Sequence, residues 1–261
     1  MKKDQPSALP GRWIRGGLLL LNTIVGNLTL LLGGLVFGGA CLLASFVPPR
    51  GRWSVPVTRG WSRVLLWGAG ARLERRYEEV LDPKDCYIFM ANHQSLFDIP
   101  AATLSLPVPF RFLAKRSLFR IPIFGWAMSA AGFVPVDRDH RERARETFAG
   151  ALGVLRQGDS LLIFPEETRS SDGQLREFQR GGFLMALKAG LSIVPVGIHG
   201  TLQVHRKGSL WIHSGTVKVG VGRPIRASDY GLKRKQELID AVTREVARLA
   251  AVPDPDPSRE A

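Results

Sequence analysis

The stretch Tyr87–Asp98, read YIFMANHQSLFD, joins an apolar run to a polar segment that carries a histidine and an aspartate. A short apolar run bounded by polar residues is typical of a buried strand. The segment that follows, Ile99–Leu106, is predicted to be a helix. A strand that leads directly into a helix is the basic unit of a parallel α/β sheet, so this stretch indicates the fold class.

The same alternation continues toward the end of the chain. The first strand is predicted at Tyr87–Met90, and further strands at Phe110–Ala114, Phe133–Val136, Ser160–Phe164, Ile193–Ile198 and Val217–Val221. Further helices are predicted at Phe124–Ala131, Arg141–Arg156, Gly181–Ala189 and Lys233–Val252. This pattern predicts an α/β domain with a mostly parallel sheet flanked by helices, which we place over residues 81–252. Pro253 ends the last helix, and residues 253–261 are predicted to be a disordered tail.

A long apolar segment precedes this domain. From Gly16 to Val47 the chain carries no charged residue across 32 positions. About 20 apolar helical residues cross the ~30 Å hydrocarbon core of a bilayer, so we predict an N-terminal membrane-embedded helical segment. Two geometries fit it: a single tilted helix, or a shallow hairpin that bends near the Gly33-Gly34 pair. A buried core helix is a weaker alternative, because core helices of this length without a charge are rare.

The charge of the chain points to an anionic partner. Lys and Arg number 36 and Asp and Glu 23, which gives a net charge of +13. Residues 1–80 hold eleven of the basic and four of the acidic residues, so a net +7 surrounds the apolar segment. Basic and aromatic residues alternate after it, as suits lipid headgroups: Trp53, Arg59, Trp61, Arg63 and Trp67. We assign residues 1–80 to membrane anchoring and expect membrane lipid, rather than nucleic acid, as the partner.

His93 and Asp98 form the first chemical pair. They lie five residues apart, across the end of a strand and the start of a helix, and that turn can bring the carboxylate onto the imidazole. A carboxylate on one ring nitrogen fixes the tautomer and leaves the other nitrogen to act as a general base. Ser95 is an alternative nucleophile, although the chain holds no G-x-S-x-G nucleophile elbow.

Two arginines indicate a phosphate site near this pair. Arg138 and Arg169 follow predicted strands, and open α/β sheets bind their ligands at the carboxyl ends of strands. Guanidinium groups suit phosphate because they bind it through two parallel hydrogen bonds. Thr168 and Ser170 could add hydroxyl donors beside Arg169.

Four motifs, in order over residues 86–200, resemble those of the glycerolipid acyltransferases, and most closely the bacterial 1-acyl-glycerol-3-phosphate acyltransferases. The family's Asn-His-x-x-x-x-Asp motif is matched by Asn92, His93 and Asp98. Its Gly-x-x-x-x-Asp-Arg block is matched by Gly132, Asp137 and Arg138. Its Phe-Pro-Glu-Gly-Thr-Arg-Ser motif is matched by Phe164, Pro165, Glu166, Thr168, Arg169 and Ser170. Its Val-Pro-Val strand is matched by Val194, Pro195 and Val196.

The resemblance implies an O-acyltransferase with a general-base mechanism and no acyl-enzyme. His93 would take the proton from the acceptor hydroxyl as that hydroxyl attacks an acyl thioester, and Asp98 would orient His93. Arg138 and Arg169, with Lys115, would hold the acceptor phosphate. The side chains of Glu166 and Thr168 would shape the site or contact glycerol hydroxyls.

The substrates implied by the resemblance are a fatty acyl thioester and a lysolipid. The donor would be acyl-CoA or acyl carrier protein, the acceptor 1-acyl-glycerol-3-phosphate, and the product phosphatidic acid in phospholipid biosynthesis. No cofactor and no metal are implied. We expect the protein at the cytoplasmic (inner) membrane with its active site facing the cytoplasm. Two cysteines are too few for a disulfide framework, which fits a reducing compartment.

Two departures from the family pattern keep other acceptors open. Glu167 stands where the family has a glycine, and Gln179 stands where it often has a lysine. Another lysolipid (a lyso-aminolipid or a lysophospholipid) or glycerol-3-phosphate is therefore an alternative acceptor, and a non-catalytic membrane-anchored protein is a more remote alternative. A metal enzyme is not favoured, because the spacing of three histidines matches no zinc signature: His199, His205 and His213.

Overall fold

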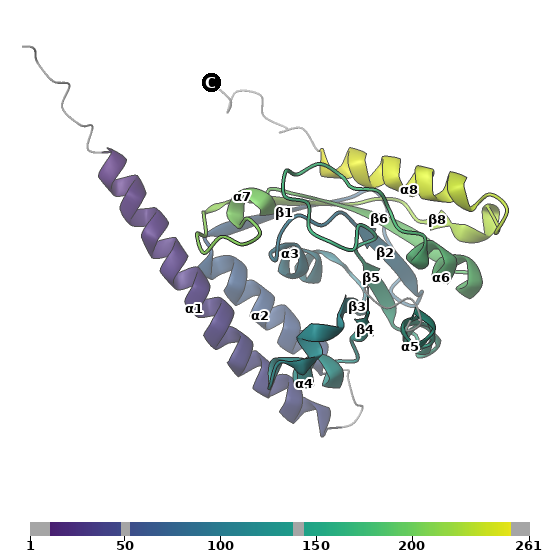
Figure 1. The fold of residues 1–261 in the computed structure, drawn as a ribbon, viewed down its shortest axis with the longest axis horizontal. Helices are drawn as coiled ribbons and strands as arrows, with labels where there is room; N and C mark the ends of the chain where they lie inside the picture. The colour runs from purple at the N-terminus through teal and green to yellow at the C-terminus, as the bar shows by residue number, and fades with distance from the viewer. Residues whose placement is uncertain (1–10, 48–52, 138–143, 252–261) are drawn as a thin grey trace, which may run out of the picture.

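The computed structural model describes residues 11–47, 53–137 and 144–251. Within these ranges an eight-stranded sheet has the order β1-β7-β6-β2-β5-β3-β4, with β8 paired to β6 (Figure 1). The strands are β1 (Ala71–Tyr77), β2 (Tyr87–Ala91), β3 (Phe110–Lys115), β4 (Val134–Val136), β5 (Ser160–Ile163), β6 (Ser192–His199), β7 (Gly215–Val221) and β8 (Ile225–Arg226). Only the pairings of β6 with β7 and β8 are antiparallel among the described strands, so the prediction of a mostly parallel sheet is confirmed.

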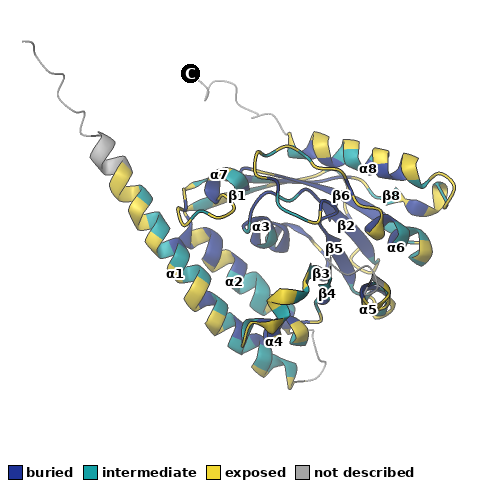
Figure 2. Cartoon of the chain, in the orientation of Figure 1, coloured by how far each residue is buried: buried dark blue, intermediate teal, exposed yellow. Residues whose placement is uncertain are grey.

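Helices cover both faces of the sheet. On one face lie α2 (Ser54–Gly68) and α3 (Asp98–Ser105); on the other lie α5 (Ala144–Arg156), α6 (Gly181–Ala189) and α8 (Lys235–Ala250). Successive strand residues point to opposite faces, so Phe89 of β2 joins the first core while Ile88 and Met90 join the second. Burial on both faces explains why β2 reads as an uninterrupted apolar run (Figure 2).

Shorter helices lie at the sheet edge where the polar motifs are found. The 3-10 helix η1 (Arg116–Arg120) and α4 (Phe124–Ala130) connect β3 to β4, and α7 (Thr201–Val204) follows β6. A second 3-10 turn, η3 (Ala227–Asp229), follows β8.

The sequence does not predict β1 or β8. β1 reads ARLERRY, and its charged side chains hide the strand pattern because it lies at the sheet edge, where half its residues face solvent. Since β1 lies within residues 1–80, the sheet extends into the region that the sequence assigns to membrane anchoring. β8 is only two residues long. The predicted helix start at residues 141–143 and the predicted tail at 253–261 lie outside the described residues.

The N-terminal segment is one continuous helix, α1 (Gly11–Ser45), of 35 residues. At 1.5 Å per residue it is about 52 Å long. The hairpin alternative is therefore wrong. Gly33 does not bend the chain; it lies against Trp61 of α2, where a Cβ would come within 3.1 Å of the indole ring. A residue without a side chain at this position allows α1 to pack closely along α2.

The outer side of α1 is exposed and apolar. Of the helices described, its Gly16–Ser45 stretch alone is long and apolar enough to cross a membrane. The inner side packs on α2 and α4, as Figure 1 shows. Exposed leucines are spread along the outer side (Figure 2): Leu18, Leu21, Leu31, Leu35 and Leu43. α1 is thus a candidate membrane segment joined to the α/β domain through α2.

Candidate active site

Four neighbouring strands end at the same edge of the sheet. β2, β5, β3 and β4 are adjacent and parallel, and open α/β sheets bind their ligands at the carboxyl ends of such strands. His93 follows β2, Glu166 follows β5, and Lys115 is the last residue of β3. The residues predicted from the sequence therefore come from three adjacent strands.

The imidazole of His93 is paired with the carboxylate of Asp98. Nδ1 of His93 lies 2.7 Å from Oδ2 of Asp98, which is fully buried, while the His93 side chain keeps 14% of its surface exposed. The carboxylate places the ring proton on Nδ1, so Nε2 is the nitrogen left to accept a proton. The predicted turn is thus observed, with Asp98 as the first residue of α3.

Four donors hold the carboxylate of Asp98 in place. Its Oδ2 also accepts the backbone N–H groups of Gln94 at 2.6 Å and Ser95 at 2.8 Å. Its Oδ1 accepts the hydroxyl of Thr201, which is buried at the start of α7. A buried carboxylate is stable when its oxygens are hydrogen-bonded in this way, so Thr201 is a positioning residue for the His93–Asp98 pair.

The backbone of His93 is held by the loop that follows β5. Its N–H donates to Oε1 of Glu166 at 2.7 Å, and its C=O accepts the N–H of Ser170 at 2.8 Å. The His93 ring stacks on Phe164 with 4.1 Å between ring centroids. Asn92 is fixed as well, because its side-chain amide exchanges two hydrogen bonds with the backbone of Ile198 in β6. The loop that carries Glu166 and Ser170 therefore holds the backbone of His93 through both its N–H and its C=O. We call these two hydrogen bonds the clamp.

Glu166 is buried, and each of its two carboxylate oxygens accepts a backbone hydrogen bond. Oε1 accepts from His93, and Oε2 accepts the backbone N–H of Arg176 at 3.0 Å. Burial raises the pKa of Glu166 from 4.5 to about 6, although the two N–H donors oppose the shift. The contacts of Glu166 shape the site by fixing the main chain around the histidine.

We expect Glu166 to make the stability of the protein depend on pH. Between its unfolded pKa of 4.5 and its folded pKa of about 6, the folded carboxyl keeps a proton that the unfolded chain has lost. The free energy of unfolding should therefore fall as the pH rises through this window, and the Glu166→Gln variant should lack this component. Thermal unfolding in detergent across the window measures it, with Glu177→Gln, an exposed position, as the control. If the difference in the free energy of unfolding between wild type and Glu166→Gln stays constant with pH, Glu166 is not the source of the pH dependence.

Glu167 adopts the conformation that a glycine would adopt more easily. Its φ is 58°, in the left-handed region, and its side chain is exposed. Glu167 thus takes a positive φ, which a glycine would adopt without strain. Lys207 lies across from the next residue, with its Nζ 3.5 Å from Oγ1 of Thr168.

Replacing Glu167 with glycine is expected to stabilise the protein. The left-handed region costs a non-glycine residue about 1–2 kcal/mol, and the greater freedom of an unfolded glycine offsets part of that gain. We expect the free energy of unfolding to rise by about 0.5–1 kcal/mol, seen as a higher unfolding temperature in detergent. Glu177→Gly, at an exposed position without a positive φ, should give no gain. A lower unfolding temperature for Glu167→Gly would refute the prediction.

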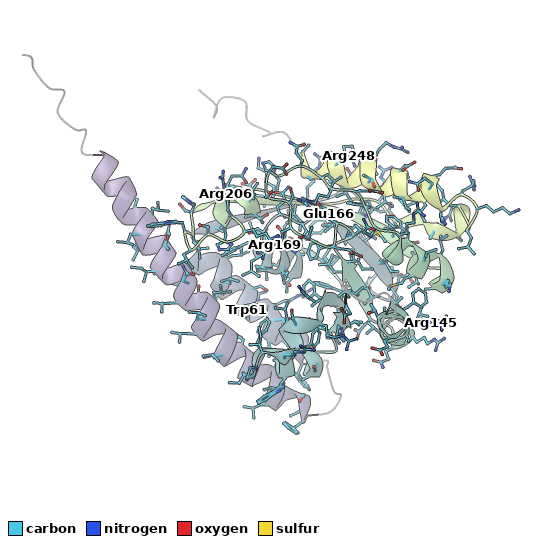
Figure 3. The ribbon with its side chains drawn as sticks, viewed as in Figure 1. Trp61, Arg145, Glu166, Arg169, Arg206 and Arg248 are labelled. Carbon is cyan, nitrogen blue, oxygen red and sulfur yellow. The ribbon has the colours of Figure 1, made fainter. Side chains whose placement is uncertain are left out.

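Basic residues lie in the loops and strand ends that follow β5, β3 and α7. Arg169 is partly buried in the loop after β5, and Figure 3 labels it together with Glu166 and with Arg206 after α7. Burial lowers the pKa of His205, the hydrogen bond to the carbonyl of Ser209 opposes that shift, and the positive charge of Arg169 adds to it. Lys115 is exposed at the end of β3, with β5 between β3 and β2.

Two predicted residues need separate comment. Arg138 lies outside the described residues; its neighbour Asp137 forms an ion pair with Arg116 at 3.6 Å. Ser95 is fully buried, and its hydroxyl donates to the carbonyl of His205 at 2.7 Å. The structure therefore gives Ser95 a structural contact, which argues against the alternative of a serine nucleophile. Across the described ranges, no three His, Cys, Asp or Glu side chains form a group that could hold a metal ion.

Sequence reasoning missed Thr201 and Lys207. Thr201 lies two residues after β6, which is parallel to β2 and ends at the same edge of the sheet. The same rule that selected Arg138 and Arg169 could have selected it. The position of Lys207 depends on how the loop after α7 folds back toward the loop after β5, and no local pattern in the sequence indicates that.

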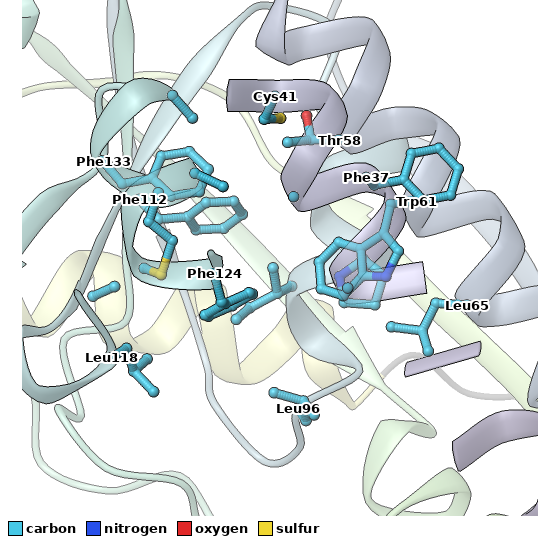
Figure 4. A pocket seen from close by; sticks show the side chains of 18 residues that line it. Phe37, Cys41, Thr58, Trp61, Leu65, Leu96, Phe112, Leu118, Phe124 and Phe133 are labelled. Atoms are coloured by element: carbon cyan, nitrogen blue, oxygen red, sulfur yellow. The ribbon is translucent and has the colours of Figure 1, made fainter. Parts of the chain in front are cut away.

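The structure holds an apolar cavity of about 180 Å³, part of whose lining comes from the turn between His93 and Asp98 (Figure 4). It lies between α1, α2, α3, β3 and α4, and its lining includes Phe37, Cys41, Trp61, Phe112, Phe124 and Phe133. Leu96, which lies between His93 and Asp98 in the chain, is part of its wall. A predominantly apolar cavity of this kind suits the hydrocarbon chain of a ligand.

Comparison with known proteins identifies relatives of this chain. A model of the acyltransferase family matches residues 72–199. A 1-acyl-sn-glycerol-3-phosphate acyltransferase of Pseudomonas aeruginosa is 31% identical over 227 residues, which cover 84% of this chain and 86% of that protein. The chloroplast 1-acyl-sn-glycerol-3-phosphate acyltransferase of Arabidopsis thaliana is 39% identical over 142 residues, 54% of this chain and 40% of that protein. The chain thus spans about half the length, or less, of the plant and algal relatives it matches.

The fold is shared with a solved structure. The crystal structure of the 1-acyl-sn-glycerophosphate acyltransferase PlsC from Thermotoga maritima matches with a TM-score of 0.77, over 92% of this chain and 99% of that chain, at 24% identity. With the relative from Pseudomonas aeruginosa aligned over most of both chains, the sequence comparison establishes more than the fold. The chain belongs to the acyltransferase family that includes the bacterial and plant 1-acyl-sn-glycerol-3-phosphate acyltransferases.

Proposed function

We propose that this protein transfers a fatty acyl group from a thioester donor to the free hydroxyl of 1-acyl-glycerol-3-phosphate and forms phosphatidic acid. The observation that carries the proposal is the His93–Asp98 pair, in which Nδ1 of His93 lies 2.7 Å from the buried carboxylate of Asp98. An apolar cavity whose wall includes Leu96, from the turn between the two residues, supports it. The relatives named as 1-acyl-sn-glycerol-3-phosphate acyltransferases support the same choice of acceptor.

The reaction follows from the orientation of His93. Nε2 accepts the proton of the acceptor hydroxyl as the hydroxyl oxygen attacks the thioester carbonyl. The tetrahedral intermediate then collapses, the C–S bond breaks, and the departing thiolate receives the proton from His93. Asp98 stabilises the imidazolium between these steps, because its carboxylate stays paired with Nδ1. No bond between protein and acyl group forms in this scheme.

The remaining residues divide between the two ends of the substrates. Arg169, Lys115 and Arg138 would bind the acceptor phosphate, and Lys207 would join them beside Thr168. An acyl chain would lie in the apolar cavity. The donor would be acyl-CoA or acyl carrier protein, both of which are anionic and suit a chain with a net charge of +13.

The apolar helix α1 would keep the enzyme at the membrane that holds its acceptor and product. We place the protein at the cytoplasmic membrane with the site facing the cytoplasm, where acyl thioesters are made. The length and the exposed leucines of α1 support membrane insertion.

Acyl transfer by the detergent-purified protein tests the proposal. An acyl thioester would be offered with lysophosphatidic acid, glycerol-3-phosphate, a lysophosphatidylcholine or a lyso-aminolipid. Transfer to lysophosphatidic acid, lost in His93→Ala, is the expected result. Transfer only to another acceptor would keep the chemistry and overturn the headgroup, an outcome that the exposed carboxylate of Glu167 would favour. No transfer to any acceptor would overturn the proposal.

A further inference from the structure

The loop that follows α7, residues 205–213, carries an exposed apolar pair that the reaction does not use. Leu210 is 78% exposed and Trp211 is 51% exposed, although both are large apolar side chains. Two adjacent exposed residues of this kind are typical of a surface that contacts another apolar partner. We name residues 205–213 the α7 loop.

The α7 loop is fastened to α1. The side-chain amide of Asn27 donates to the carbonyl of Leu210 at 2.9 Å. The hydroxyl of Thr23 bridges both backbone groups of Ile212, accepting from its N–H at 3.2 Å and donating to its C=O at 3.3 Å. The side chain of Ile212 packs where a Cβ on Gly26 would lie. Three of the polar and small residues of an otherwise apolar segment thus fix the loop to the candidate membrane helix.

The chemistry of the loop suits the surface of a bilayer. The apolar pair is preceded by two exposed basic residues, Arg206 and Lys207, and Figure 3 labels Arg206 after α7. Tryptophan and leucine enter the headgroup region, while nearby basic side chains pair with anionic lipid phosphates. The backbone of Leu210 and Ile212 is bound to Asn27 and Thr23 of α1. The exposed pair therefore lies beside the Gly16–Ser45 segment and extends its apolar surface.

The other end of the same loop touches the active site. The carbonyl of His205 accepts the hydroxyl of Ser95, and Nζ of Lys207 lies 3.5 Å from Oγ1 of Thr168. Within nine residues, therefore, the chain passes from the catalytic motifs to a contact with α1.

We propose that the α7 loop is a lipid-contacting segment, separate from α1, which inserts Leu210 and Trp211 into the bilayer surface and holds the acceptor site against it. The partner of this surface is the lipid bilayer, because basic residues adjoin the apolar pair and the pair lies next to α1. The lipid contact does not depend on the reaction that the protein catalyses, whereas its effect on acyl transfer rests on the proposed function.

A fluorescent dye on the loop tests the lipid contact directly. Leu210→Cys, in a Cys41→Ala and Cys86→Ala background, would carry an environment-sensitive thiol dye. The protein would be placed in vesicles of equal parts phosphatidylcholine and phosphatidylglycerol. We expect the dye to report an apolar environment and to be quenched by lipids spin-labelled near the headgroup. Leu232→Cys, 61% exposed in the turn before α8, is the matched control and should report water.

Two results from the dye would overturn the lipid contact. One is a dye at position 210 that reports water and escapes quenching, as at position 232. The other is shielding that depends on protein concentration rather than on lipid, which would assign the surface to a second copy of the chain.

Acyl transfer with two forms of acceptor tests the consequence for the reaction. The double variant Leu210→Ser with Trp211→Ser is expected to transfer to vesicle-embedded lysophosphatidic acid about tenfold more slowly, because partial insertion of two apolar side chains into the bilayer surface contributes free energy of about that size. Transfer to a water-soluble short-chain acceptor should stay within about twofold of wild type, as should both activities of Leu232→Ser.

The pattern of activities separates the two proposals. Equal loss with both acceptors, or no loss with either, would overturn the role of the loop in presenting the acceptor. A wild type that transfers acyl groups to neither acceptor would overturn the proposed function instead, and the dye would still decide whether the loop contacts lipid.

Discussion

Replacing His93 with alanine is expected to lower kcat for acyl transfer by about 10³-fold, within the range that a positioned general base contributes. The substitution removes Nε2 and leaves the acceptor hydroxyl to lose its proton to water. Folding should be preserved, because the clamp binds the main chain of residue 93, which alanine retains. KM for the acceptor should change little, since His93 acts on the proton in transit rather than on the phosphate. Steady-state kinetics in detergent with a saturating acyl thioester measures both constants.

The control for this variant is His213→Ala. His213 is exposed in the α7 loop and lies outside the pair, so its loss should leave kcat within about twofold of wild type. Thermal unfolding of both variants checks that they are folded. A folded His93→Ala variant with near wild-type transfer would rule out the general-base mechanism.

Replacing Asp98 with asparagine is expected to lower kcat by about 10³- to 10⁴-fold, because an amide cannot stabilise the imidazolium and favours the wrong tautomer of the ring. The change nearly conserves volume but not hydrogen bonding. Asp98 accepts four hydrogen bonds, and an asparagine must turn its NH₂ group toward some of these donors. We therefore expect a second effect, a loss of about 1–3 kcal/mol in the free energy of unfolding.

Kinetics and thermal unfolding separate these two effects, with Asp240→Asn as the control. Asp240 is exposed on α8 and contacts only Gln236 among the hydrogen bonds of the described residues, so its variant should match wild type in both measurements. An Asp98→Asn variant that loses stability but keeps its kcat would reduce Asp98 to a structural role.

The predictability of this fold depends on where each element lies in the sheet. β2 is buried on both faces, so its apolar run is visible in the sequence. β1 lies at the edge of the sheet and carries several charged side chains, so the sequence does not indicate a strand there. Of the two geometries that the sequence left open for the N-terminal segment, the hairpin near Gly33 is not the one observed, for a related reason. Glycine can break a helix or let two helices pack closely, and the choice depends on whether a partner such as Trp61 is present.

At the site, contacts between residues that are close in the sequence are predictable, whereas contacts between distant residues are not. The turn from His93 to Asp98 is local, so the spacing of five residues predicts their contact. The clamp between Glu166 and the backbone of His93 joins residues 73 positions apart, and it exists because β5 is placed next to β2 in the sheet. The contact of Thr201 with Asp98 spans 103 positions and depends on β6 lying on the other side of β2. The motifs therefore identify Glu166 but not the backbone it binds, and Thr201 lies outside all four motifs.

The clamp on His93 also affects how the site exchanges protons with solvent. The amide protons of His93 and Ser170 lie in loops, where exchange is usually fast, yet each is engaged across the boundary between the two motifs. Both can exchange only when the β2 and β5 loops separate. Their hydrogen–deuterium exchange rates therefore measure how often the catalytic centre comes apart, and a ligand that stabilises the assembled centre would slow both amides together.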